Sequence, residues 1–130
     1  MTEAASLPVL LIPGLGCTAR LYTEQMPALW TFGPVTVADH RRADSMDEIA
    51  RQILAEAPRR FALAGLSMGG YIALAIMRIA PERVMRLALL DTGSRSLRLH
   101  RVLRGRLSVL SFVYSYCLSL IHISEPTRPY

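Results

Sequence analysis

One six-residue stretch has the residue types and spacing for covalent chemistry. Gly65-Leu66-Ser67-Met68-Gly69-Gly70 places a serine between two glycines, directly after the apolar run Phe61-Ala62-Leu63-Ala64. A serine hydroxyl is a poor nucleophile unless the fold lifts it clear of the surface and a base takes its proton. A sharp strand-to-helix turn does the lifting, because it strains the serine backbone and exposes Oγ at the end of the strand. We therefore interpret Ser67 as a candidate nucleophile.

The residues around Ser67 fit such a turn. Gly65 and Gly69 stand where side chains would collide if a strand and a helix approached closely, so we expect both to be structural. A helix that begins after the serine leaves its first backbone N–H groups without intrahelical acceptors, and the N–H of Met68 is then suited to face a developing negative charge. The bland alternative is a glycine-rich turn without chemistry. The flanking strand-like and helix-like runs favour the nucleophile interpretation.

Length and composition indicate one folded domain. The chain has 130 residues, of which 52% are hydrophobic, and its mean hydropathy is +0.29. This composition argues against disorder. The start of the chain, Met1 to Ser6, carries no basic residue, so we predict no secretory signal and a cytoplasmic location. Cys17 and Cys117 lie too far apart in sequence to suggest a metal motif or a disulfide framework, and we expect free thiols.

The net charge of +5 is unevenly distributed. Residues 1–94 carry nine arginines and nine acidic residues, whereas residues 95–130 carry six arginines and the single acid Glu125. The basic balance therefore belongs to the end of the chain. We predict no nucleic-acid partner for the domain, because no basic excess lies within it.

Short apolar runs alternate with helix-like segments along the first ninety residues. The expected strands are Pro8–Ile12, Val35–Ala38, Phe61–Ala64 and Val84–Leu90, and the expected helices are Ala19–Trp30, Met46–Ala57 and Tyr71–Ala80. Ser45 and Glu48 form a capping-box pattern before the second helix, whose buried stripe is expected to include Met46. Pro27 should kink or shorten the first helix. This alternation predicts an α/β fold with a parallel sheet and helices on both faces.

The character of the sequence changes after Gly93. All fifteen alanines precede this point, whereas seven of the ten serines follow it. Arginines recur every third residue from Arg95 to Arg104, a spacing that suits a basic amphipathic helix, and residues 107–123 carry no formal charge. We assign residues 1–93 to the domain and residues 94–130 to a separate tail.

Part of this tail resembles translated adapter DNA. Leu118 to Arg128 is similar to an in-frame translation of a transposase-type sequencing adapter. We interpret the tail as adapter-derived, with a shift of reading frame after about Gly93 as the reason for the lost alanines. The alternative is a basic helix with an apolar anchor that binds a membrane surface, and we do not expect it because serines and His122 interrupt the uncharged run.

Four motifs in order carry a family resemblance. They are Leu10-Leu11-Ile12-Pro13-Gly14-Leu15-Gly16, Asp39-x-Arg41, Gly65-x-Ser67-x-Gly69 and Leu89-Leu90-Asp91-Thr92. With them, residues 7–93 resemble the N-terminal half of an α/β-hydrolase-fold enzyme. The resemblance implies a truncated, doubly wound, mostly parallel sheet in the strand order second, first, third, fourth. It also implies that Ser67 is the nucleophile, that the backbone N–H groups of Leu15 and Met68 form the oxyanion hole, and that Gly14 supports this loop.

The remaining catalytic groups of that family do not have clear counterparts. The family places its acid and its histidine after the serine, on loops that follow later strands. Only His100 and His122 follow Ser67, and neither comes after an expected sheet strand. Asp91 ends the fourth strand and is interpreted as structural, while His40 follows a strand that the first strand separates from Ser67. We therefore expect the catalytic acid and histidine to be absent from this chain. Because no further strand is expected to pair with the fourth strand, we also expect its outer edge to be exposed and prone to aggregation.

The resemblance implies a serine hydrolase that acts on a carboxylic ester or a similar small acyl substrate, with little or no turnover by this chain. Two alternatives stay open. One is a hydrolase-like binding module without catalysis, and the other is a dinucleotide-binding fragment, because Gly14-x-Gly16 and the later Asp39 superficially fit such a site. We expect no cofactor and no metal. The sequence specifies neither the individual substrate nor an oligomeric state.

Overall fold

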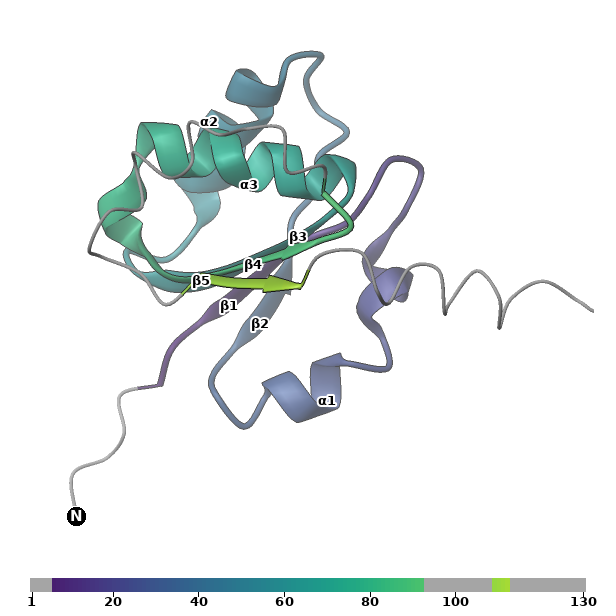
Figure 1. Cartoon of the computed structure of the whole chain (residues 1–130), viewed down its shortest axis with the longest axis vertical. Coiled ribbons are helices and arrows are strands. Elements are labelled where there is room, and N and C mark those ends of the chain that lie inside the picture. The colour runs from purple at the N-terminus through teal and green to yellow at the C-terminus, as the bar shows by residue number, and fades with distance from the viewer. Residues whose placement is uncertain (1–5, 93–108, 113–130) are drawn as a thin grey trace, which may run out of the picture.

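The central element is a five-stranded parallel sheet. A computed structural model describes residues 6–92 and 109–112, and it arranges the strands in the order β2-β1-β3-β4-β5 (Figure 1). The strands are β1 (Val9–Ile12), β2 (Val35–Val37), β3 (Phe61–Leu66), β4 (Val84–Leu90) and β5 (Val109–Phe112). All four neighbouring pairs are parallel. The predicted order of the first four strands and the parallel sheet are confirmed.

Helices cover both faces of the sheet. Helix α2 (Met46–Glu56) and helix α3 (Met68–Ile79) lie together on one face, and the short helix α1 (Met26–Leu29) lies on the other (Figure 1). Two 3-10 turns, η1 (Ala19–Tyr22) and η2 (Pro81–Arg83), precede α1 and β4. The single helix expected over residues 19–30 is therefore divided, and Pro27 lies in the first turn of its second piece. Proline suits a first helical turn but not a helix interior.

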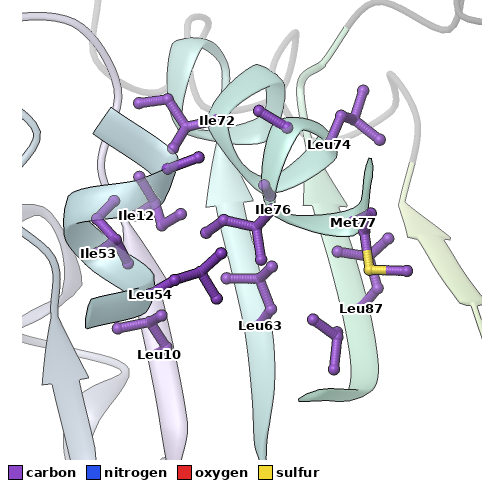
Figure 2. Close-up of a cluster of buried hydrophobic side chains, with 14 of the residues drawn as sticks. Leu10, Ile12, Ile53, Leu54, Leu63, Ile72, Leu74, Ile76, Met77 and Leu87 are labelled. Atoms are coloured by element: carbon purple, nitrogen blue, oxygen red, sulfur yellow. The ribbon is translucent and has the colours of Figure 1, made fainter. Parts of the chain in front are cut away.

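Alternation along β1 assigns its side chains to two cores. Leu10 and Ile12 belong to the large cluster under α2 and α3 (Figure 2), whereas Val9 and Leu11 pack with Tyr22 on the opposite face. All four strand residues are buried, as expected for a strand that is covered on both faces. This double covering fixes the end of β1, from which the loop next to Ser67 departs.

Helix α2 is held at both ends. The Ser45 hydroxyl accepts a hydrogen bond from the Glu48 N–H, at 3.2 Å, as the capping-box pattern predicts. At the other end, the Arg83 guanidinium donates to the carbonyl oxygens of Leu54, Ala57 and Pro58. One residue differs from expectation, because Met46 is exposed and lies outside the buried stripe.

The fourth strand is not an edge. Leu87–Leu90 of β4 pairs in register with Val109–Phe112, so the predicted exposed edge at β4 is wrong. Residues 109–112 lie inside a long uncharged run of the tail, in which no strand was predicted. The proposed basic helix after Arg95 and the adapter-like segment after Leu118 lie outside the described residues. Within the described part, no helix is long and apolar enough to cross a membrane.

Candidate active site

Ser67 lies at the junction between β3 and α3 with a strained backbone. Its φ is 52° and its ψ is −114°, a combination that residues with a Cβ rarely adopt. The Ser67 N–H donates to the Leu90 carbonyl oxygen at 2.8 Å, and the Gly70 N–H donates to the Ser67 carbonyl oxygen at 2.9 Å. Contacts to β4 and α3 therefore hold the serine in this conformation, and the residue is exposed.

The glycines around Ser67 allow three backbones to meet. A Cβ on Gly65 would collide with the Gly69 carbonyl, and a Cβ on Gly69 would collide with the carbonyl oxygens of Ile12 and Pro13. The first turn of α3 thus packs directly on β3 and on the end of β1. Neither position has room for a side chain.

Thr92 supports the turn from the end of β4. Its buried hydroxyl lies 3.3 Å from the Ser67 carbonyl oxygen and 3.2 Å from the Leu90 carbonyl oxygen. A Cβ on Gly70 would collide with the Thr92 side chain, so the two residues are in close contact. Thr92 belongs to one of the four sequence motifs, but this role could not be predicted because the contact joins residues far apart in sequence.

The loop after β1 runs beside Ser67 and is held through its carbonyl groups. The Tyr22 hydroxyl donates to the Ile12 carbonyl oxygen at 2.8 Å, and the Cys17 N–H donates to the Gly14 carbonyl oxygen at 3.0 Å. A Cβ built on Gly14 would lie 3.7 Å from the Ser67 Cβ. Leu15 follows Gly14 and is 79% exposed. The fold therefore brings Gly14 and its loop beside the serine, and Met68 begins the helix directly after Ser67.

Tyr22 stays uncharged beneath this loop. The pKa of Tyr22 is raised to about 12, mainly by burial and also by the neighbouring Cys17, while a backbone hydrogen bond from Leu66 opposes the rise. The hydroxyl therefore keeps its proton at neutral pH and remains a hydrogen-bond donor to the end of β1.

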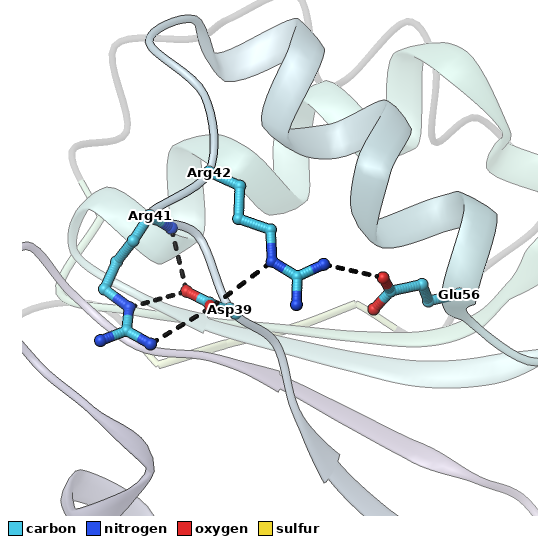
Figure 3. Close-up of polar contacts among 4 residues, drawn as sticks. All are labelled: Asp39, Arg41, Arg42 and Glu56. Carbon is cyan, nitrogen blue, oxygen red and sulfur yellow. Dashed lines mark hydrogen bonds and ion pairs between the residues drawn. The ribbon is translucent and has the colours of Figure 1, made fainter.

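The loop after β2 is stabilised by an ion-pair network. Arg41 donates to Asp39 through Nε at 2.8 Å, and Arg42 bridges from Asp39 to Glu56 on α2 (Figure 3). The hydrogen bonds from Arg41 hold the pKa of Asp39 at about 2, below its ordinary value. This network joins the loop after β2 to helix α2.

A cavity of about 270 Å³ lies between the loops that follow β1 and β2. Its lining includes Pro13, Cys17, His40 and Arg41, but not Ser67. His40 is the one histidine in the described residues, and its Nε2 lies 3.0 Å from the Gly14 carbonyl oxygen. His100 and His122 lie outside the described residues. The described part of the chain also has no cluster of three residues able to hold a metal ion.

Comparisons with known proteins point to one family. No family model matches the sequence. The chain is 31% identical over 102 residues to the pimeloyl-acyl-carrier-protein methyl ester esterase of Photobacterium profundum, an alignment that covers 72% of this chain and 40% of that protein. The chain is related to the α/β-hydrolases.

Solved structures support the same assignment. A hydrolase from Pseudomonas aeruginosa matches with a TM-score of 0.56 and 27% identity, over 68% of this chain and 39% of that one. The N-formylmaleamic acid deformylase of Pseudomonas putida S16 matches with a TM-score of 0.57 and 28% identity, over the same shares of the two chains, 68% and 39%. The predicted α/β-hydrolase fold is confirmed, and the chain spans well under half the length of these α/β-hydrolases.

Proposed function

We propose that Ser67 is the nucleophile of a serine hydrolase that acts on a carboxylic ester or a similar small acyl substrate. The strained backbone of Ser67, with φ at 52° between β3 and α3, carries this proposal, because such strain persists only where surrounding contacts impose it. The related esterase and the deformylase support an acyl substrate, since both of their names describe acyl chemistry.

In this proposal the chemistry proceeds by acyl transfer. Ser67 Oγ loses its proton to a base as it attacks the carbonyl carbon, the C=O π electrons move to oxygen, and the N–H groups of Leu15 and Met68 donate hydrogen bonds to the oxyanion. Collapse of the intermediate breaks the ester C–O bond, the leaving alkoxide takes up the proton from the base and departs as the alcohol, and an acyl group stays on Ser67. Water then loses a proton to the base as it attacks the acyl carbon, and Ser67 Oγ takes up that proton as the carboxylic acid is released.

The hydrolytic activity of this chain depends on a base that accepts the proton of Ser67. A serine without a base has the reactivity of an ordinary alcohol. His40 is the one histidine among the described residues, and its Nε2 is engaged by the Gly14 carbonyl. We therefore propose that the chain, as given, has little or no turnover.

The test compares full-length variants by mass spectrometry and by hydrolysis of p-nitrophenyl acetate. A fluorophosphonate probe should label the wild-type chain slowly and at Ser67, should not label Ser67→Ala, and should label Ser6→Ala at the wild-type rate because Ser6 is an exposed serine outside the site. Equal labelling of Ser67→Ala would refute the nucleophile. Rapid ester hydrolysis that disappears in Ser67→Ala would instead refute the proposed lack of turnover.

A binding module without catalysis is the second candidate. It is favoured by the same contact between His40 and Gly14, which occupies the single histidine of the described part. Acyl ligands would then perturb the resonances of the Ser67 turn without any covalent product. A dinucleotide site is disfavoured, because Arg41 already occupies the Asp39 carboxylate that would contact a ribose.

A further inference from the structure

His40 is a buried polar side chain between two exposed neighbours in the loop after β2. It is 7% exposed, whereas the side chains of its neighbours Asp39 and Arg41 are 34% and 73% exposed and pair with each other. Its Nε2 lies 3.0 Å from the Gly14 carbonyl oxygen, 26 residues away in sequence. A carbonyl oxygen only accepts hydrogen bonds, so Nε2 carries the hydrogen in this contact.

This contact acts on the peptide that supplies the Leu15 N–H. The Gly14 carbonyl and the Leu15 N–H belong to one planar unit, and no peptide bond in the described residues is cis. In a trans peptide the C=O and the N–H point in opposite directions, so a donor that fixes the oxygen also fixes the direction of the N–H. The Cys17 N–H donates to the same oxygen at 3.0 Å, so two donors hold it.

The position of this peptide matters because it lies beside Ser67. A Cβ on Gly14 would be 3.7 Å from the Ser67 Cβ and 3.4 Å from the Leu66 carbonyl oxygen. Gly16, with φ at 70°, turns the chain immediately afterwards. The Cys17 thiol contacts the Leu15 carbonyl oxygen at 3.7 Å, and among the described residues the bond from His40 is the one side-chain hydrogen bond to the Gly14 carbonyl.

We propose that His40 is a positioning residue, which holds the Gly14–Leu15 peptide so that the Leu15 N–H faces the oxyanion formed when Ser67 attacks an acyl substrate. This inference rests on the function proposed above. This role does not require His40 to act as the base, because Nε2 only donates a hydrogen bond to Gly14. Both the neutral tautomer with a proton on Nε2 and the imidazolium can donate this hydrogen bond.

The direct test is nuclear magnetic resonance of the full chain, with His40→Gln, His40→Leu and Asp44→Asn as variants. The Gln side chain reaches as far as His Nε2 and keeps a donor, while Leu removes it. Asp44→Asn changes an exposed side chain of the same loop, outside the ion-pair network of Arg41 and Arg42. We expect the Gly14 carbonyl carbon and the Leu15 amide resonances to shift in His40→Leu and to stay near their wild-type positions in the other two variants.

The functional readout is the rate at which the fluorophosphonate labels Ser67. Because misplacing a group by about 1 Å can cost a hundredfold in rate, we expect a loss of about tenfold or more in His40→Leu, with recovery in His40→Gln. Should His40→Leu fail to fold, His40→Asn replaces it, since the shorter amide cannot reach Gly14.

The outcomes separate this inference from the proposed function. Unchanged Gly14 and Leu15 resonances in the variant without the donor would overturn the role of His40, as would a labelling rate equal to wild type. Labelling that persists in Ser67→Ala, or that never occurs in the wild-type chain, would count against the proposed function. In that case the Gly14 and Leu15 resonances still decide whether His40 holds the peptide.

Discussion

Replacing Ser67 with glycine should stabilise the fold relative to replacing it with alanine. Both substitutions remove the hydroxyl, but only alanine keeps a Cβ at φ 52° and ψ −114°. A residue in such a conformation costs about 1–3 kcal/mol, while glycine loses about 0.5–1 kcal/mol through its freer unfolded chain. We therefore expect Ser67→Gly to exceed Ser67→Ala by about 0.5–2 kcal/mol in the free energy of unfolding.

Urea denaturation of the two variants, followed by circular dichroism, measures this difference. An alanine-to-glycine change at Ala55 is the matched control, because Ala55 is exposed within α2, where glycine should destabilise by about 1 kcal/mol. Opposite signs at the two positions are the expected result. A Ser67→Gly variant that is less stable than Ser67→Ala would refute the inference that the native turn is strained.

Three further predictions concern the supports of the site. Gly69→Ala should lower the free energy of unfolding by about 1–3 kcal/mol, because the alanine Cβ would meet backbone carbonyls that cannot move aside. Urea denaturation measures the loss, and a variant as stable as the wild type would contradict the close packing. Arg83→Met should cost about 3 kcal/mol, since it removes charged hydrogen bonds to three carbonyl oxygens at the end of α2, and a thermal melt that matches wild type would show that these bonds contribute nothing net. The stability that Tyr22 provides should be complete below pH 10.0 and decline as the pH rises toward its folded pKa of about 12, because only the unfolded chain ionises easily in that interval. Tyr22→Phe should flatten this alkaline decline in a series of thermal melts, and an equal decline in both proteins would assign it to other groups.

Local patterns in the sequence predict much of the fold. The strands predicted at Pro8–Ile12 and Phe61–Ala64 form as the parallel strands Val9–Ile12 and Phe61–Leu66, and Ser45 caps α2 by accepting a hydrogen bond from the Glu48 N–H. These features depend on residues close together in the chain, so their periodicity and capping signals are visible without the structure. The division of the first helix at Pro27 follows from the same kind of local rule.

Contacts between distant segments account for what the sequence did not predict. The bonds from Thr92 to Ser67 and from His40 to Gly14 join positions 25 and 26 residues apart, and no local pattern encodes them. The strand at Val109–Phe112 was missed because an uncharged run can equally suit a strand, a buried helix or an anchor. Ser67 itself was predicted as a candidate because glycine spacing is a local signal.

The placement of β2 has a consequence for local unfolding. β2 has three residues, pairs only with β1 among the described strands, and is only half-buried. Such edge elements open at lower free energies than a central strand. Because His40 follows β2, its release would free the Gly14–Leu15 peptide while β3, α3 and β4 still held Ser67 in place. Native-state hydrogen exchange should therefore show two separable opening reactions, one at β2 and the Gly14 loop and a slower one at the Ser67 turn.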